Sequence, residues 1–229
     1  MTETQPHSPA PQRPAKPKKL HPYPLWTPRF WHGMRFGDWI RLLVENRFRI
    51  HPARWAMVVL ISMITPFNTV MSRVQRLIYG RRIDATDLVD PPLFIIGHWR
   101  SGTTFLHELM VHDDRFTYPT TFQCFAPFHF LLTEWFLAKY CGFLLPKRRP
   151  MDNVRLGFEH PQEDEAALCN LGRPSPFLTV AFPNRGLAHP RFEDFDQLTP
   201  AERRQWENSL KRFLRRLLLK RPGRLVLKS

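Results

Sequence analysis

The sequence is poor in cysteine, and its three cysteines lie far apart. Cys124, Cys141 and Cys169 are odd in number and form no Cys-x-x-Cys motif. Disulfide-stapled domains and structural zinc sites both need more cysteine, or closer spacing, than this chain contains. We therefore expect free thiols, no metal site and a reducing, cytoplasmic compartment.

Acidic residues are scarce at both ends of the chain. The net charge is +14, yet residues 83–198 hold more acidic than basic side chains, so the basic excess lies in the flanks. Such flanks could attract an anionic cofactor, a nucleic acid or a membrane surface, or could simply be solvated. Composition alone does not choose among these.

Charge is absent from residues 55–72, and arginines stand on both sides of this run. Its 18 residues just reach the length of a candidate membrane span. However, the second half contains Thr65, Pro66 and Asn68. We expect a packed helix or a membrane-surface helix here rather than a span, with peripheral membrane contact as the less favoured alternative.

The chain divides into three parts. Residues 1–24 contain seven prolines and several lysines and are expected to form a disordered tail. Residues 25–90 are expected to be helical, with Trp39, Leu42, Leu43 and Val44 on one helix from Gly37 onward. Residues 91–229 contain alternating strand and helix patterns and form the third part.

This third part has the pattern of a parallel α/β sheet. Residues 93–96 (LFII) predict a strand buried on both faces, and residues 225–227 (LVL) predict a second. A helix over residues 103–112 is expected to bury Phe105, Leu106, Leu109 and Met110. Another is expected to begin near Pro161, which suits the first helical position, and to run to about Asn170.

A capping box marks the last helix. Thr199 is followed three residues later by Glu202, and Pro222-Gly223 ends the helical pattern. The expected apolar face follows the helical period: Trp206, Leu210, Phe213, Leu214, Leu217 and Leu218.

The most informative segment is LFIIGHWRSGTTFL, residues 93–106. A strand, a short loop and a helix start aim backbone N–H groups at one point, which favours a bound phosphate. Gly102 permits close backbone approach, and Arg100 supplies a planar cation suited to phosphate. Ser101, Thr103 and Thr104 add hydroxyl donors.

This loop differs from the P-loop of nucleotide triphosphatases. Gly97 and Gly102 keep the G-x-x-x-x-G spacing, but Thr103 stands where the P-loop has Lys. A nucleotide kinase or triphosphatase therefore remains an alternative that the sequence does not favour.

The string R-S-G-T-T-F-L after an apolar strand resembles the 5′-phosphosulfate loop of sulfotransferases that use 3′-phosphoadenosine 5′-phosphosulfate (PAPS). The strings RPMDN (149–153), HPQEDEAALCN (160–170) and RPGRLVLKS (221–229) resemble a bacterial subfamily. The resemblance implies a P-loop-like three-layer fold, PAPS as co-substrate, no essential metal, and phosphosulfate binding by Arg100, Ser101, Gly102, Thr103 and Thr104.

The same resemblance implies a second phosphate site that the sequence given does not contain. Sulfotransferases bind the 3′-phosphate through an Arg and a Ser that follow the L-K-S-P strand, and this chain ends at Ser229. We therefore expect the C-terminal part of the fold to be missing and the chain to be a poor catalyst.

The catalytic residues are less sharply indicated. Lys228 is a candidate because tyrosylprotein sulfotransferases have a lysine at a similar strand end, although it could be a surface lysine. The base that those enzymes carry after the first helix is absent, which leaves Glu163 and Glu165 as candidates and His160 as a rival. A carboxylate among apolar residues can have its pKa raised into a useful range, but acids also favour helix starts for electrostatic reasons alone. The acceptor of the sulfuryl group is left open.

Overall fold

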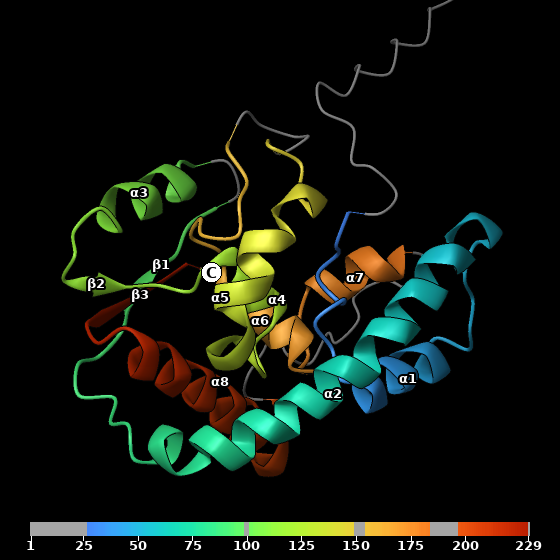
Figure 1. The fold of residues 1–229 in the computed structure, drawn as a ribbon, viewed down its shortest axis with the longest axis horizontal. Helices are drawn as coiled ribbons and strands as arrows, with labels where there is room; N and C mark the ends of the chain where they lie inside the picture. The colour runs from blue at the N-terminus through green and yellow to red at the C-terminus, as the bar shows by residue number, and fades with distance from the viewer. Residues whose placement is uncertain (1–26, 99–100, 149–153, 184–196, 229) are drawn as a thin grey trace, which may run out of the picture.

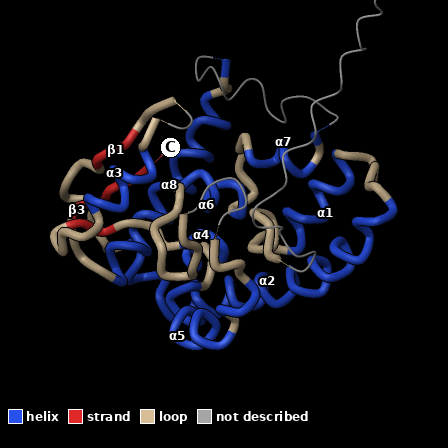
Figure 2. The backbone as a smooth tube through the Cα atoms, turned by 90° about the horizontal axis from the view of Figure 1, so that it is seen from above, coloured by secondary structure: helices blue, strands red, loops and turns tan. Residues whose placement is uncertain are grey.

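The computed structural model describes residues 27–98, 101–148, 154–183 and 197–228, so the predicted tail over residues 1–24 lies outside the described residues. Within them, helices surround a small sheet of three parallel strands in the order β1-β3-β2 (Figures 1 and 2). The strands are β1 (Leu93–Ile95), β2 (Phe116–Thr117) and β3 (Arg224–Lys228). The predicted α/β class with a parallel sheet is confirmed at this level, while the three-layer P-loop-like arrangement stays a prediction.

The N-terminal region is helical, as the sequence predicts. It consists of α1 (Phe36–Glu45), a 3-10 turn η1 (Pro52–Arg54) and α2 (Trp55–Asp84). Helix α1 packs on α2 through Trp39, whose indole N–H donates a hydrogen bond to the Ser62 hydroxyl at 3.0 Å. The four residues predicted to share this helix do so, and Trp39, Leu42 and Leu43 are buried while Val44 is 55% exposed.

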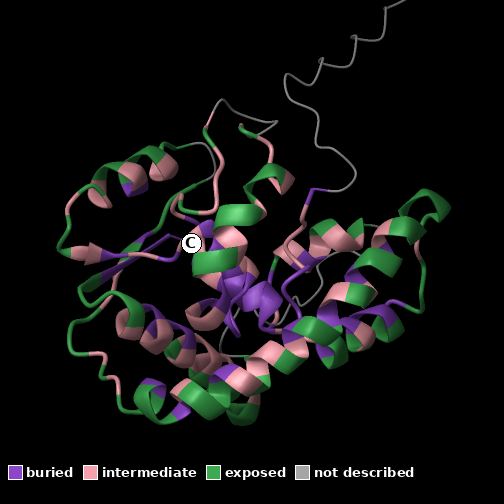
Figure 3. Ribbon diagram, viewed as in Figure 1, coloured by how far each residue is buried: buried purple, intermediate pink, exposed green. Residues whose placement is uncertain are grey.

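Helix α2 extends beyond the uncharged run of residues 55–72 and ends at Asp84. Pro66 lies inside the helix and does not interrupt it. Its buried side is narrow and partly polar; for example, the Asn68 amide donates to the backbone oxygens of His32 and Met34 at 2.8 and 3.0 Å. The exposed side carries large apolar residues: Trp55, Val59, Leu60, Met63, Phe67, Val70, Leu77 and Ile78. Figure 3 shows this helix as largely exposed or intermediate.

Seven further helical elements complete the described fold: α3 (Thr103–Met110), α4 (Thr121–Phe125), α5 (Phe130–Tyr140), η2 (Gly142–Leu144), α6 (Asp164–Asn170), α7 (Phe177–Ala181) and α8 (Pro200–Lys220). The capping box of α8 is confirmed, with the Thr199 hydroxyl accepting from Glu202 N. Its predicted apolar face is also confirmed, since Phe213, Leu214 and Leu217 are buried in the main core beside α4, α6 and β3.

Two predicted apolar faces are wrong. Phe94 and Ile96, which follows β1, are 48% and 81% exposed, whereas Ile95 between them is buried, so only one face of this segment is covered. In α3, Phe105 and Leu109 are 67% and 54% exposed, and Leu106 and Met110 are not buried either. The buried side chain of α3 is His107, because that side of the helix docks on the sheet.

The predicted start of α6 is also wrong. Pro161 forms an isolated antiparallel bridge with Thr120, and Gln162 N donates to Pro119 O at 2.9 Å. These contacts hold the segment extended, so α6 begins at Asp164 with Glu163 as its N-cap. The predicted end at Asn170 is confirmed.

Candidate functional site

The candidate site lies where β1 and β3 end. The two strands are parallel, and Ile95 is paired with Lys228. Carboxyl ends of parallel strands lie at one edge of a sheet, which is where ligands of open α/β sheets bind. The loop that follows β1 therefore starts next to Lys228, and α3 returns over β1 and β3 (Figure 1).

The described part of the loop is closed by its own hydrogen bonds. Ser101 donates to His98 O through both its backbone N–H, at 3.2 Å, and its hydroxyl, at 2.6 Å. Gly102 is the N-cap of α3 with φ 91°, a left-handed conformation that costs a glycine little and other residues more. Thr103 and Thr104 then open α3 and are half-buried. Arg100 lies outside the described residues.

Lys228 and Glu163 form an ion pair at this edge. Lys228 is 7% exposed, and Glu163 reaches it from the N-cap position of α6. The position of Glu163 is fixed by the extended segment before it, in which His160 O accepts from Thr121 N at 2.9 Å. The Cys124 thiol also donates to Glu163 O at 3.5 Å. Residues from three distant parts of the sequence thus meet at one point.

His107 lies beside this ion pair, and the sequence analysis missed it. The ring is 2% exposed and makes an edge contact with Tyr118. Burial, reinforced by the charge of Lys228, lowers the His107 pKa to about 4, while Glu163 and a backbone hydrogen bond with Val226 act in the opposite direction. His107 is therefore neutral near pH 7. In the sequence, the signal that pointed to His107 was a polar residue among the apolar residues of α3.

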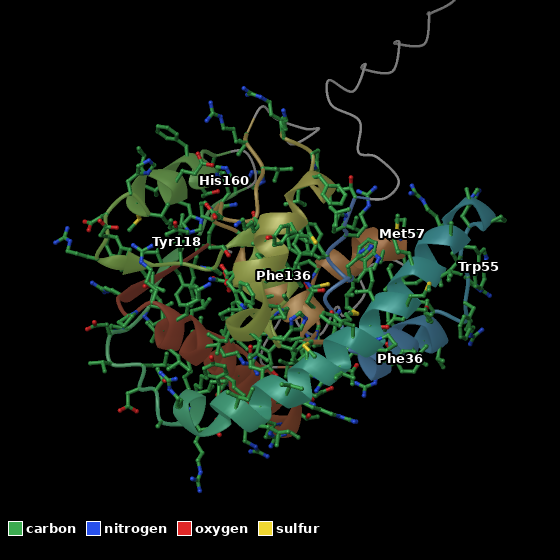
Figure 4. All side chains as sticks on the ribbon, in the orientation of Figure 1. Phe36, Trp55, Met57, Tyr118, Phe136 and His160 are labelled. Atoms are coloured by element: carbon green, nitrogen blue, oxygen red, sulfur yellow. The ribbon has the colours of Figure 1, made fainter. Side chains whose placement is uncertain are left out.

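The other two candidate bases are placed differently. Burial raises the Glu165 pKa to about 7, against a hydrogen bond with Ser175, and the charges of Asp164 and Glu163 add to the rise. Glu165 is thus directed to the 173–177 segment rather than to the Lys228 ion pair. His160 lies on the side of the molecule that carries Tyr118 and α3 (Figure 4). Among the residues that the structure describes, no cluster of three or more His, Cys, Asp or Glu could hold a metal ion.

Comparison with known proteins finds similar curated sequences. The chain is 47% identical, over 204 residues, to curated sulfotransferases, and the match covers 89% of the chain. The chain is thus similar to these sulfotransferases over most of its own length, which agrees with the resemblance carried by the R-S-G-T-T string.

The matched relatives are the omega-hydroxy-beta-dihydromenaquinone-9 sulfotransferase Stf3 of Mycobacterium bovis (strain ATCC BAA-935 / AF2122/97) and that of Mycobacterium tuberculosis (strain CDC 1551 / Oshkosh). The match covers 52% of each relative, so the chain spans about half the length of the curated relatives it matches. No family model matches the chain. No solved structure matches it either.

Proposed function

We propose that the protein transfers a sulfuryl group from PAPS to a hydroxyl or amine acceptor. The observation that carries the proposal is the R-S-G-T-T loop, which starts at the sheet edge where Lys228 pairs with Glu163. The similarity to curated sulfotransferases supports it. A nucleotide kinase is disfavoured because Thr103 replaces the P-loop lysine, and a purely basic binding protein would leave this constellation unexplained.

The reaction needs charge stabilisation on the donor side. A bond forms between the acceptor oxygen or nitrogen and sulfur, while the bond from sulfur to the phosphate oxygen of PAPS breaks. The leaving group is adenosine 3′,5′-bisphosphate, and negative charge grows on its 5′-phosphate. The N-terminus of α3, Arg100 and Lys228 would stabilise this charge. Gly102, Ser101, Thr103 and Thr104 would bind the phosphosulfate as the loop of the family does.

The acceptor must lose a proton, and Glu163 is the best placed base. Its carboxylate forms an ion pair with the Lys228 ammonium. When the donor phosphosulfate binds, it would compete with Glu163 for the Lys228 ammonium and leave the carboxylate available to the acceptor proton. Glu165 and His160 are the alternatives; Glu165 is hydrogen-bonded to Ser175.

We further propose a lipid-like acceptor reached at a membrane surface. The relatives are named for a hydroxylated dihydromenaquinone. In this chain, residues Pro52–Asp84 form one helix long and apolar enough to cross a membrane, and only 22% of its most apolar window is buried. Length and composition do not distinguish spanning from surface binding. The charged flanks and the arginines along the second half of α2 favour a helix that lies on an anionic surface.

The decisive experiment, made on the full-length gene product, is calorimetric titration with adenosine 3′,5′-bisphosphate, combined with a sulfuryl-transfer assay. Arg100→Ala should abolish transfer and weaken nucleotide binding, because Arg100 is the one cation in the sequence between Gly97 and Gly102. Arg203→Ala, an exposed change at the start of α8, is the matched control and should behave as the unchanged protein. Near-normal turnover by Arg100→Ala would refute the assignment of this loop.

A further inference from the structure

A second basic feature lies away from the sheet edge. A partly open cavity of about 180 Å³ lies between α2 and α8, which contact one another along the lower side of the molecule in Figure 1. Its lining is shared by α2, α8 and three short segments: Arg35, Ser72, Gln75, Arg76, Gly80, Ile83, Phe128, Leu171, Arg173, Ser209, Arg212 and Arg216. None of the loop or acid residues proposed for sulfuryl transfer belongs to this lining.

Positive charge exceeds negative charge around this cavity. Of its five arginines, Arg35 pairs with Asp38 at 2.9 Å and Arg212 pairs with Asp84 at 3.1 Å. The deeper arginines donate hydrogen bonds to neutral backbone oxygens instead. Arg216 donates to Pro127 O at 2.9 Å. Five guanidinium groups thus face two carboxylates among the described contacts, which leaves room for further anionic charge.

The same cavity holds polar hydrogens without acceptors. The Gln75 side-chain oxygen accepts from Leu131 N at 3.0 Å, which fixes the amide and leaves its NH₂ group as a buried donor. That nitrogen and Arg216 Nε have no hydrogen-bond partner among the described residues. A buried donor left unsatisfied typically costs ~1–3 kcal/mol. Both groups are donors, so a ligand that satisfies them must bring acceptors.

Repulsion among the arginines is visible in their ionisation. Burial lowers the pKa of Arg216 to about 10, and the charges of Arg212 and Arg35 lower it further against the effect of Asp84. Burial likewise lowers the pKa of Arg173. An anion in the cavity would relieve this repulsion and raise the pKa of the arginines again.

We propose that the cavity between α2 and α8 is a binding site for a phosphate-type oxyanion. Its volume is below the range of ~300–1,000 Å³ typical of sites for drug-sized ligands, so it suits a small group rather than a nucleotide. The group is either free phosphate or the headgroup phosphate of a phospholipid. The phospholipid headgroup is included because α2, whose second half lines the cavity, exposes apolar side chains along its outer side. This site does not depend on the proposed sulfuryl transfer.

The test compares two arginines one turn apart on α2. Both side chains are exposed, but Arg76 lines the cavity and Arg73 does not. Inorganic phosphate is titrated into the protein by calorimetry in a chloride buffer. In parallel, the protein is mixed with phosphatidylcholine vesicles with or without phosphatidic acid. Arg76→Ala should weaken binding at least fivefold and Arg76→Glu should abolish it, while Arg73→Ala should change it less than twofold. Gln75→Leu, which removes the unsatisfied amide without changing charge, should also weaken binding.

The phosphate titration and the vesicle experiment together distinguish free phosphate from a phospholipid headgroup. Phosphate binding that depends on Arg76 supports a site for the free anion. Binding to phosphatidic acid vesicles alone, with the same dependence on Arg76 and Gln75, supports the lipid headgroup. The proposal is overturned if neither probe binds, or if Arg73→Ala weakens binding as much as Arg76→Ala does, since the effect would then be general electrostatic attraction. Circular dichroism of each variant verifies that α2 and α8 remain folded.

Discussion

Lys228 and Glu163, 65 residues apart in the sequence, form an ion pair at the carboxyl edge of the sheet. The lysine is the last described residue of β3, and the glutamate caps α6. Because Lys228 is also paired with Ile95 of β1, this ion pair stands beside the start of the R-S-G-T-T loop. This ion pair brings three segments of the proposed transfer site together. The role of Glu163 in it can be tested by substitution.

Glu163→Gln should reduce kcat by ~10²–10⁴-fold, the usual cost of losing a general base. Binding of adenosine 3′,5′-bisphosphate should be retained, because the amide keeps the shape of the side chain and Lys228 stays in place. Turnover at saturating PAPS measures kcat, and calorimetry measures the binding of adenosine 3′,5′-bisphosphate. Glu165→Gln is the matched control and should be much less affected. If Glu163→Gln and Glu165→Gln both remain fully active, neither acid is the base, and His160 is then tested.

Three buried histidines should make the protein sensitive to acid. Burial lowers the pKa values of His32, His107 and His129 to about 4. Each histidine favours its neutral form in the folded state. Its contribution to the free energy of unfolding is therefore present above pH 6.5 and is lost as the pH falls towards 4. Each is worth up to ~3 kcal/mol over this range. The thermal midpoint should fall steeply between pH 6.5 and 4, and His107→Leu should flatten that fall. A midpoint that stays constant across this range would contradict the prediction.

Glu165 should act with the opposite sign. Burial raises its pKa from 4.5 to about 7, so the folded state favours the neutral acid. The resulting stability is present below pH 4.5 and is lost as the pH rises to about 7. Glu165→Gln, which stays neutral, should therefore be more stable relative to the unchanged protein at pH 7.5 than at pH 4.5. Denaturant unfolding at the two pH values measures this difference, and an equal effect at both would show that Glu165 ionises normally.

The exposed apolar side of α2 should bind membranes. Met63 and Leu77 are 72% and 85% exposed, and burial of a large apolar side chain contributes ~1.5–3 kcal/mol. Met63→Glu should therefore lower partitioning into anionic vesicles about tenfold or more, and Leu77→Glu should do the same if the helix lies flat. Val89→Glu, at an equally exposed site between α2 and β1, is the control. Vesicle sedimentation gives the measurement, and a similar loss for Val89→Glu would show that added negative charge alone is responsible.

Gly33 should be the position at which the N-terminal helical region is most sensitive to a methyl group. A Cβ there would lie 1.9 Å from Phe125 O and 2.8 Å from the Asn170 side chain, whose oxygen accepts from Gly33 N. Gly33→Ala should destabilise the protein by ~1–3 kcal/mol. Gly37→Ala in α1 meets nothing within 4 Å and should be neutral or stabilising by up to ~1 kcal/mol. Denaturant unfolding compares the two, and equal stabilities would show that the Gly33 contact is not tight.

The sequence by itself determined the elements whose signals are local. The capping box at Thr199 and the apolar period of α8 depend on residues within a few positions of one another, and both were predicted correctly. The strand–loop–helix order around residues 93–106 and the family likeness of the loop were likewise contained in one continuous string. Such signals depend on neighbouring residues and here agree with the global fold.

Only the tertiary structure decided which faces meet. The period of α3 identified an apolar side, but the docking of the helix on β1 and β3 buried His107 instead. Pro161 had the signature of a helix start, yet its bridge to Thr120 kept the chain extended and placed Glu163 at the cap. The cavity between α2 and α8 depends on side chains up to 181 positions apart, from Arg35 to Arg216. Contacts of this kind depend on how whole elements pack, and packing is determined by shape and burial across the molecule rather than by any local pattern.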